Sequence, residues 1–321
     1  MAQAGRIPIA PGMERLDGGS TVPAQLRGGI VALGNFDGFH LGHQAVVGRA
    51  IARARAEGRP ALVATFDPHP MRFFRPDSAW FRLTTLDQRE ELVRAEGTDA
   101  MLVFSFDAAL AGLSAEGFVT ERLLGQLGVG GVVTGEDFTF GKGRSGSVAQ
   151  LAELGRAHGF SVDTVAPVTL DGEVVSSSRI RALLQAGDPS GAARLLTRSY
   201  TIRGIVEHGD KRGRELGYPT ANLSMANYLR PAYGIYAVRG RLPDGRVLGG
   251  AASLGVRPTF DPPKELLEPF FFDFAGDLYG QVIDVELIEF LRPEAKFDTL
   301  DALTAQMAAD CDRARILLAA S

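Results

Sequence analysis

The alternation of apolar runs with helical patterns in the first half of the chain constrains the fold most. Apolar runs typical of buried strands lie at 28–34, 61–67, 100–107, 131–135 and 160–168. Amphipathic, helix-forming segments lie between them, at 43–58, 85–97, 114–128 and 147–159. This strand, helix, strand rhythm predicts a Rossmann-like parallel sheet of about five strands with helices on its faces. Ligands of such sheets bind at the carboxyl ends of the strands.

The sequence changes in character near residue 199. From Tyr200 the apolar runs are short, alternating and separated by turn residues, as in YTIRGIVEHG and YGIYAVRGRL. This pattern predicts an antiparallel sheet or small β-barrel, followed by an amphipathic C-terminal helix that starts at Asp298 or Thr299. Because 321 residues exceed the size of most single cores, we expect two domains, 1–187 and 188–321, with residues 1 to about 22 as a loose arm.

Composition excludes several classes of protein. No apolar run is long enough to span a membrane and the N-terminus lacks the apolar region of a signal peptide, so we expect a cytoplasmic protein without membrane partners. The single cysteine, Cys311, excludes an internal disulfide and a cysteine zinc site. A net charge of −4 without a basic stripe argues against nucleic acid as a partner. Positive charge for anionic substrates must be local, at Lys142 with Arg144, Arg179 with Arg181, Lys211–Arg214, and Arg257. Self-association stays open.

The segment GNFDGFHLGH, residues 34–43, follows the first predicted strand. Gly34 and Gly38 permit a tight turn, and a helix is predicted to begin near Leu41. The start of a helix after a parallel strand offers free N–H groups and a positive dipole end, which suit an anion. His40 and His43 fall at this helix start, where an imidazole can donate to phosphate oxygens.

Two other interpretations of the histidine pair stay open at this point. A metal site needs further ligands, and Asp37 is the only nearby candidate. The histidines could also simply occupy a helix end. Three further segments favour the anion site, because each follows a predicted strand and can reach the same edge of the sheet: TFDPHP at 65–70, GEDFTFGKGRSG at 135–146 and SSSRIR at 176–181.

These four motifs together resemble the adenylyltransferase module of the bacterial bifunctional riboflavin kinase/FAD synthetase family, in the HxGH nucleotidyltransferase superfamily. The resemblance implies transfer of an adenylyl group from ATP to FMN, with His40 and His43 as catalytic residues. It also implies the ATP-binding residues Gly34, Phe36, Asp37, His40, His43, Ser176, Ser177, Ser178 and Arg181. Asp137 and Phe138 are implied, more tentatively, near the flavin. Ser178 stands where the family usually has threonine.

The second constellation begins with GIVEHGDKRGRELGYPTANL, residues 204–223. It pairs glycine-rich turns with a basic cluster and a strand predicted to end in PTAN, but it lacks the GxxxxGK[ST] pattern of a Walker loop. With YGIYAV, SLGVRPTF, LEPFFFDFAGDLYG and FLRPEAKFDTLDAL it resembles the riboflavin kinase domain of the same family. The resemblance implies kinase ATP-binding residues Gly209, Lys211, Gly213, Thr220 and Asn222, of which Thr220 and Asn222 would hold Mg²⁺.

Glu268 is assigned to catalysis by the resemblance, and the chemistry supports it independently. A ribityl hydroxyl is a poor nucleophile at neutral pH, so a carboxylate that accepts its proton is useful. Pro269 restricts the backbone of Glu268 and removes a donor, which predicts an edge strand or a bulge. Ser253 stands in place of an asparagine common in the family.

The sequence therefore predicts an enzyme that converts riboflavin to FMN and FMN to FAD, with ATP and Mg²⁺. Two rivals stay open. One is another HxGH adenylyltransferase, acting on pantetheine phosphate or nicotinamide mononucleotide, and the other is a flavin-binding regulatory protein without turnover. Oligomeric state, substrate inhibition, transfer of FMN between domains and reversal of the FAD step are not predicted.

Overall fold

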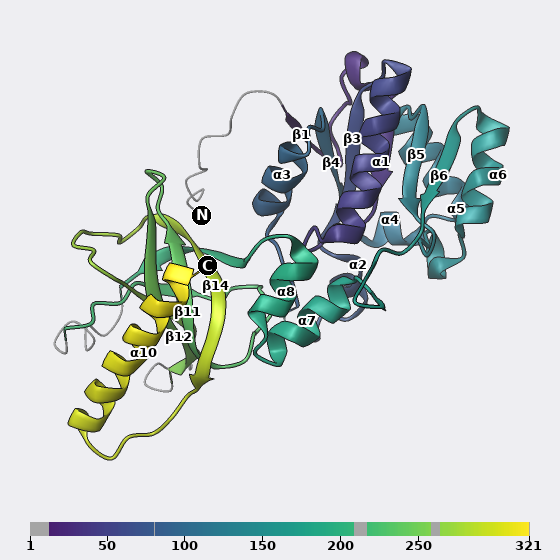
Figure 1. Ribbon diagram of the computed structural model, residues 1–321. Helices are drawn as coiled ribbons and strands as arrows, with labels where there is room; N and C mark the ends of the chain where they lie inside the picture. Colours follow the sequence, from purple (N-terminus) through teal and green to yellow (C-terminus); the bar gives the residue numbers. More distant parts are fainter. Residues whose placement is uncertain (1–12, 80, 209–216, 258–263, 321) are drawn as a thin grey trace. The chain divides into compact units, whose positions relative to one another are not determined.

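The computed structural model describes residues 13–79, 81–208, 217–257 and 264–320. The chain separates into two units, one from the described residues of 10–79 and 86–176, the other from those of 80–85 and 177–321. Each unit has its own sheet, and each is described by itself (Figure 1).

The first unit is built on a six-stranded sheet in which every neighbouring pair is parallel, in the order β1-β4-β3-β2-β5-β6. Its strands are β1 (Glu14–Asp17), β2 (Ile30–Leu33), β3 (Ala61–Asp67), β4 (Ala100–Ser105), β5 (Gly131–Gly135) and β6 (Ser161–Val165). The predicted parallel sheet is confirmed, with one strand more than expected. The loose arm is wrong for residues 14–17, because β1 pairs with β4 and buries Leu16 in the core. Four residues are too few for an alternating pattern to indicate a strand.

Helices cover both faces of this sheet. They are α1 (Leu41–Glu57), α2 (Pro70–Phe74), α3 (Leu86–Ala95), α4 (Ala108–Gly112), α5 (Ala115–Gly117) and α6 (Val148–His158), with the short 3-10 turns η1 (Ala24–Leu26) and η3 (Lys142–Arg144). The segment predicted as one helix over 114–128 is α5 followed by a π-helix, η2 (Phe118–Leu127). A two-stranded hairpin, β7 (Thr169–Leu170) with β8 (Glu173–Val174), follows β6.

Alternation along β2 divides its side chains between two cores. Ile30 and Ala32 pack in a cluster with residues of α1, whereas Val31 and Leu33 pack in a second cluster with residues of η2 and α6. Complete burial on both faces is typical of a central parallel strand and explains the continuous apolar run. The chain leaves β2 toward β3 and β4, and later returns to β5 on the other side of β2. The carboxyl ends of β2 and β5 therefore flank the switch point, where ligands of such sheets bind.

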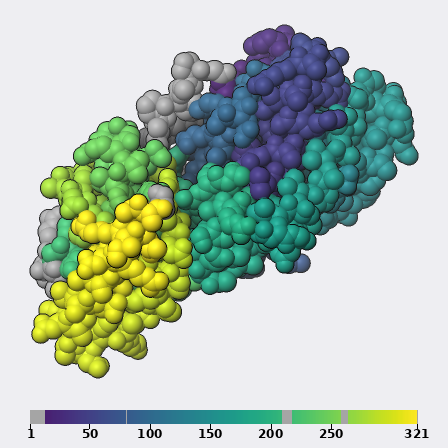
Figure 2. Space-filling model, viewed as in Figure 1, coloured from purple at the N-terminus to yellow at the C-terminus, as the bar shows by residue number. Residues whose placement is uncertain are grey.

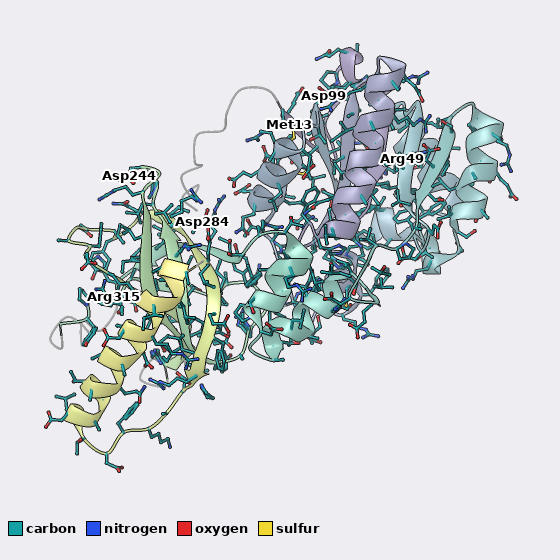
Figure 3. All side chains as sticks on the ribbon, in the orientation of Figure 1. Met13, Arg49, Asp99, Asp244, Asp284 and Arg315 are labelled. Carbon is teal, nitrogen blue, oxygen red and sulfur yellow. The ribbon has the colours of Figure 1, made fainter. Side chains whose placement is uncertain are left out.

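The second unit contains a closed antiparallel barrel in the order β10-β13-β12-β11-β14-β9, which confirms the predicted barrel. Its strands are β9 (Tyr200–Glu207), β10 (Asn222–Ser224), β11 (Gly234–Arg241), β12 (Val247–Arg257), β13 (Lys264–Phe271) and β14 (Val282–Pro293). The helices α7 (Ser177–Gln185) and α8 (Pro189–Leu196) precede it. Asp284 on β14, labelled in Figure 3, accepts hydrogen bonds of 2.6 and 2.7 Å from Arg203, its register partner on β9.

The last helix, α10 (Leu300–Ala320), packs on the outside of the barrel and is yellow in Figure 2. Thr299 Oγ1 accepts a hydrogen bond of 3.2 Å from Ala302 N–H, which agrees with the predicted cap. Arg315 fixes the helix through Phe272, whose ring centroid lies 4.1 Å from its guanidinium, and through Asp273 at 2.9 Å. Across the described residues, no helix combines the length and apolar character needed to cross a membrane.

Candidate active sites

The turn between β2 and α1 holds an unusual backbone conformation. Phe36 and Phe39 have φ angles of 51° and 46°, and Gly38 between them has 87°. Left-handed backbone at a bulky residue costs of order 1–3 kcal/mol and persists only where the surroundings enforce it. Both phenylalanine side chains are 1% exposed in the core that contains α1, β2 and β3. Packing therefore holds this turn in one shape before any ligand arrives.

His40 and His43 lie at the start of α1, as predicted from the sequence. The helix begins at Leu41, His40 is its N-cap, and the carbonyl of His40 accepts a 2.9 Å hydrogen bond from Gln44 N–H. The two imidazole rings stack with centroids 3.7 Å apart and planes 19° apart, and the edge of Phe36 meets His43 at 5.3 Å. A Cβ at Gly42 would approach His40 Cε1 to 3.2 Å, so glycine leaves room for this stack.

The stacking geometry argues against the metal interpretation. Lone pairs of imidazole lie in the ring plane, and two nearly parallel planes 3.7 Å apart do not direct them at one ion about 2.1 Å from each nitrogen. In the described part of the chain, no group of three or more His, Cys, Asp or Glu residues is arranged to hold a metal. The pair instead lies at the N-terminus of α1, where an anion is stabilised.

Asp37 lies beneath the turn rather than on its surface. Its carboxylate is 3% exposed and stands 4.0 Å from the guanidinium of Arg89, which is equally buried on α3. Arg89 also donates a 3.0 Å hydrogen bond to Thr65 Oγ1, and Thr65 Oγ1 donates at 2.9 Å to the carbonyl of Asn35. Strand β3, helix α3 and the turn are thus tied together at one point.

Thr65 belongs to the segment TFDPHP named from the sequence, whereas Arg89 was not predicted. An available signal was the position of Arg89 on α3, because it lies three residues after Leu86 and four before Val93, on the apolar stripe of that helix. A charged residue on a buried stripe indicates a buried partner.

The segment TFDPHP leads from β3 into an aromatic cluster. His69 Nδ1 accepts from Met71 N–H at 3.1 Å and caps α2, so this histidine has a structural contact. Phe73 and Phe74 of α2 meet Phe106, which follows β4, at 5.5 and 5.8 Å between centroids. The ring of Phe74 is 62% exposed. The carboxyl ends of β3 and β4 therefore carry an exposed aromatic surface, which the sequence analysis did not identify.

The segment GEDFTFG follows β5 at the same edge of the sheet. Phe138 is half-buried and stacks on Phe140 with centroids 5.9 Å apart, while Asp137 is exposed. A Cβ at Gly135 would lie 2.9 Å from Asp137 Oδ1, so glycine lets that carboxylate fold back toward the end of β5.

The segment SSSRIR does not directly follow a strand of the parallel sheet, contrary to expectation, because the β7–β8 hairpin intervenes. Ser176 belongs to the unit of the parallel sheet, whereas Ser177, Ser178 and Arg181 belong to the barrel unit. Arg181 Nε donates at 2.8 Å to the carbonyl of Phe81, and its guanidinium lies 5.2 Å from the ring centroid of that residue. Its approach to a nucleotide stays a prediction.

In the barrel, PTAN and Glu268 lie on neighbouring segments. Ala221 N–H donates to the carbonyl of Pro269 at 2.9 Å, which sets Thr220 and Asn222 beside the strand of Glu268. PTAN precedes β10 rather than ending a strand, since β10 begins at Asn222. Asn222 is 6% exposed and Thr220 is half-buried. Gly209, Lys211 and Gly213, predicted to bind ATP, lie outside the described residues.

The expectation of an edge or bulge at Pro269 is wrong. Strand β13 is paired on both sides, and its register with β12 runs without a shift through Ala252 opposite Pro269. Continuing the β10 register places Pro269 opposite Ala221, one residue before β10 begins. The missing donor therefore falls where the neighbouring strand has not yet started, which is why proline is tolerated there.

Glu268 makes an ion pair in this structure. Nε and Nη2 of Arg257 both contact Glu268 Oε2, and Nη2 also donates to Ser253 Oγ at 3.0 Å. The side chain of Glu268 is 17% exposed and that of Arg257 is 29% exposed. Ser253 stands opposite Glu268 in the register of β12 and β13, so the departure from asparagine places a hydroxyl in this contact.

Comparisons with known proteins cover nearly the whole chain. A sequence model of the family described as FAD synthetase matches residues 22–179, and one described as riboflavin kinase matches residues 196–318. A protein of Pseudomonas fluorescens named bifunctional riboflavin kinase/FMN adenylyltransferase is 41% identical over 296 residues, covering 92% of this chain and 94% of its own. One of the same name from Bacillus subtilis is 38% identical, covering 88% and 90%.

A solved structure has the same architecture. The crystal structure of a protein from Streptococcus pneumoniae, titled a macrolide-efflux protein, superposes with a TM-score of 0.82 at 30% identity, covering 93% of this chain and 97% of its own. Its title differs from the names of the sequence relatives, although the likeness spans both units.

Proposed function

Because the chain belongs to the family of bifunctional riboflavin kinase/FMN adenylyltransferases, we propose that it makes FMN and FAD from riboflavin. Riboflavin and ATP give FMN and ADP, and FMN with a second ATP gives FAD and pyrophosphate. One observation carries the proposal: the same chain has a histidine pair at the switch point of a parallel sheet and a PTAN segment bonded to the strand of Glu268. We assign the adenylyl transfer to residues 1–187 and the kinase to 188–321, which the extents of the two family matches support.

In adenylyl transfer the attacking group is the phosphate of FMN, which is already an anion and needs no general base. Catalysis then consists of alignment and of neutralising charge on the α-phosphate of ATP. We assign this neutralisation to His40 and His43 together with the N-terminus of α1. The preformed turn at Gly34 and Phe36 holds the nucleotide, and Asp37 contributes by fixing that turn. Ser176, Ser177, Ser178 and Arg181 are assigned to the outer phosphates, for which a forked guanidinium is suited.

We assign the isoalloxazine ring of FMN to the aromatic edge of the sheet. Phe73, Phe74 and Phe106 offer an exposed apolar face, and planar rings stack favourably on such a face. Asp137 and Phe138, which follow β5 at the same edge, are assigned to the flavin more tentatively, as the resemblance implied.

In the kinase reaction the ribityl hydroxyl of riboflavin must lose a proton as it attacks the γ-phosphate. Glu268 is proposed to accept this proton, since it is a carboxylate next to Pro269, whose carbonyl accepts a hydrogen bond from Ala221 of PTAN. Both the phosphate donor and the hydroxyl must meet there, and PTAN is placed to hold the phosphates.

Mg²⁺ fits the donors of this segment. Thr220 supplies a hydroxyl and the buried Asn222 an amide, which are hard oxygen ligands of the kind the ion prefers. A site with one or two protein ligands agrees with the lack of a His, Cys, Asp and Glu cluster among the described residues, because phosphates and water supply the rest. When bound, the ion would neutralise charge on the phosphate oxygens.

We further propose that the enzyme works in the cytoplasm on small molecules and without nucleic acid, in line with its net charge of −4.

The test is to change one site at a time and measure both products by chromatography after incubation with riboflavin, Mg²⁺ and ATP. His40→Ala is expected to abolish FAD formation and to leave FMN formation largely intact, and Glu268→Ala to do the reverse when FMN is supplied. If either substitution removed both activities in a folded protein, the division of labour would be wrong. An adenylyltransferase for pantetheine phosphate or nicotinamide mononucleotide would form neither flavin product, and a flavin-binding regulator would bind riboflavin without turnover.

A further inference from the structure

The guanidinium of Arg257 lies between three acceptors in the barrel. Besides Glu268 and Ser253 it reaches Glu294, whose Oε1 is 3.4 Å from Nη1. Arg257 and Ser253 are four residues apart on β12 and share one face of that strand. The register sets Glu268 of β13 opposite Ser253. Two strands and the segment after β14 thus converge on one cation.

Gly255, between Ser253 and Arg257 on the same face, makes this convergence possible. A Cβ at Gly255 would lie 2.1 Å from Glu294 Oε1 and 2.7 Å from its carboxyl carbon. The carboxyl group of Glu294 therefore lies directly over the glycine. A single positive charge stands between two carboxylates, and each of them can compete for it.

Arg257 contacts Glu268 at Oε2. The hydrogen bond from Nε and the ion pair with Nη2 are both made to this oxygen. A guanidinium that holds one carboxylate oxygen with two nitrogens restricts where that carboxylate can move, because the guanidinium is planar and rigid. A base held this way keeps one oxygen aimed in a set direction.

We propose that Arg257 is the positioning residue for Glu268 in the kinase reaction. The inference rests on the proposed function, in which Glu268 accepts the proton of the ribityl hydroxyl. Arg257 holds Oε2, and Oε1 takes the proton as the oxygen of riboflavin bonds to the γ-phosphorus and the bond to ADP breaks. Ser253 and Glu294 hold the guanidinium from its other sides.

If Arg257 only stabilised the fold, its replacement would change stability rather than the kinase rate of a folded variant. Both side chains are partly exposed, so water screens their attraction and the pair contributes little to stability. Loss of Arg257 should therefore barely change folding. A kinase defect in a stable variant would then report on the orientation of Glu268.

The test compares Arg257→Met, Arg257→Lys and the control Arg241→Met in the full chain. Arg241 forms another Arg–Glu pair of the same barrel, with Glu286 at 3.6 Å. Since a general base contributes about 10²–10⁴ in rate, R257M is expected to lower kcat for FMN formation by at least about tenfold, with KM for riboflavin within about twofold. R257K should recover part of kcat. R241M, and FAD formation from supplied FMN in every variant, should stay at the wild-type level.

A double variant shows whether Arg257 acts through Glu268. R257M added to Glu268→Gln should slow the reaction no further, because the group being positioned is already lost. The inference is overturned if R257M keeps kcat within threefold of wild type while E268Q is inactive, if the defect is in KM alone, if R257K is no better than R257M, or if R241M is equally slow. If E268Q itself keeps wild-type kcat, the proposed role of Glu268 fails instead.

Discussion

The buried pair beneath the histidine turn allows a sharp test of how that turn is held. Replacing Arg89 with methionine removes a guanidinium that is 3% exposed and leaves the equally buried carboxylate of Asp37 without this neighbour. At 4.0 Å their attraction is about 4 kcal/mol with an effective dielectric constant near 20. Removing one partner of a buried pair generally costs about 3–5 kcal/mol. We expect R89M to lower the free energy of unfolding of the parallel-sheet unit by about that amount.

The double variant Asp37→Asn/Arg89→Met separates stability from activity. It removes both charges of the pair, so much of the lost stability should return. The turn at Phe36 and Phe39 still loses its tether to α3, and its left-handed backbone can then relax. FAD formation is therefore expected to stay at least about tenfold below wild type in the double variant, because misplaced donors stabilise charge poorly.

The measurements are denaturant unfolding followed by a probe in the parallel-sheet unit, and rates of FAD formation. FMN formation in the same chain serves as the control, since we assign it to the barrel. The reasoning would be refuted if R89M cost less than about 1 kcal/mol, the range of an exposed ion pair. A double variant no more stable than the single one would refute it as well, since the penalty would not then come from a buried charge.

Two further outcomes follow from the contacts described. Gly42→Ala would place a Cβ 3.2 Å from His40 Cε1, 3.3 Å from Nδ1 and 3.6 Å from the carbonyl of Val175. The imidazole ring of His40 must then shift, so the rate of FAD formation should fall several-fold while the rate of FMN formation is unchanged. A steady-state rate of FAD formation equal to that of the wild type would contradict this. The hydrogen bond from Arg230, together with that from Tyr233, lowers the pKa of Glu265 below its usual value of 4.5. The ionised carboxylate therefore stabilises the fold fully above pH 4.5, and this contribution is lost as the pH falls through the lower pKa of the folded state. Glu265→Gln should accordingly weaken the loss of barrel stability in acid unfolding as the pH falls below 4.5, and an unchanged pH dependence would show that this carboxylate does not contribute.

The sequence predicts most of the fold because its patterns are local. Each central strand of the parallel sheet is a continuous apolar run, and the short alternating runs after Tyr200 close into the barrel. The start of α1 at Leu41 follows from the glycines and the helical pattern around it. Strand β1 was missed because only Leu16 marks its buried side. The π-helix was missed because π-helices are rare and apolar residues at spacings of three and four in 114–128 indicate an α-helix.

The contacts around the candidate sites depend on pairings that are not local. Asp37 and Arg89 are 52 positions apart, and the sequence around neither residue indicates that the other is its partner. Arg257 and Glu268 meet because β12 and β13 pair in one particular register. A shift of one residue would put Glu268 on the opposite face of the barrel wall. Motifs indicated the candidate residues, whereas their partners became apparent only from the three-dimensional structure.

The placement of carboxylates separates the two proposed chemistries. An anionic nucleophile attacking an anionic α-phosphate is opposed by any further negative charge, and the carboxylate nearest the histidine turn is buried beside Arg89. A neutral hydroxyl nucleophile needs a base, and Glu268 is partly exposed on the strand bonded to PTAN, with a cation on one of its oxygens. In the first unit the carboxylate supports the shape of a turn, and in the second we propose that it accepts the proton of the hydroxyl. One phosphate donor can thus serve two reactions in one chain because each unit controls negative charge in the way its nucleophile requires.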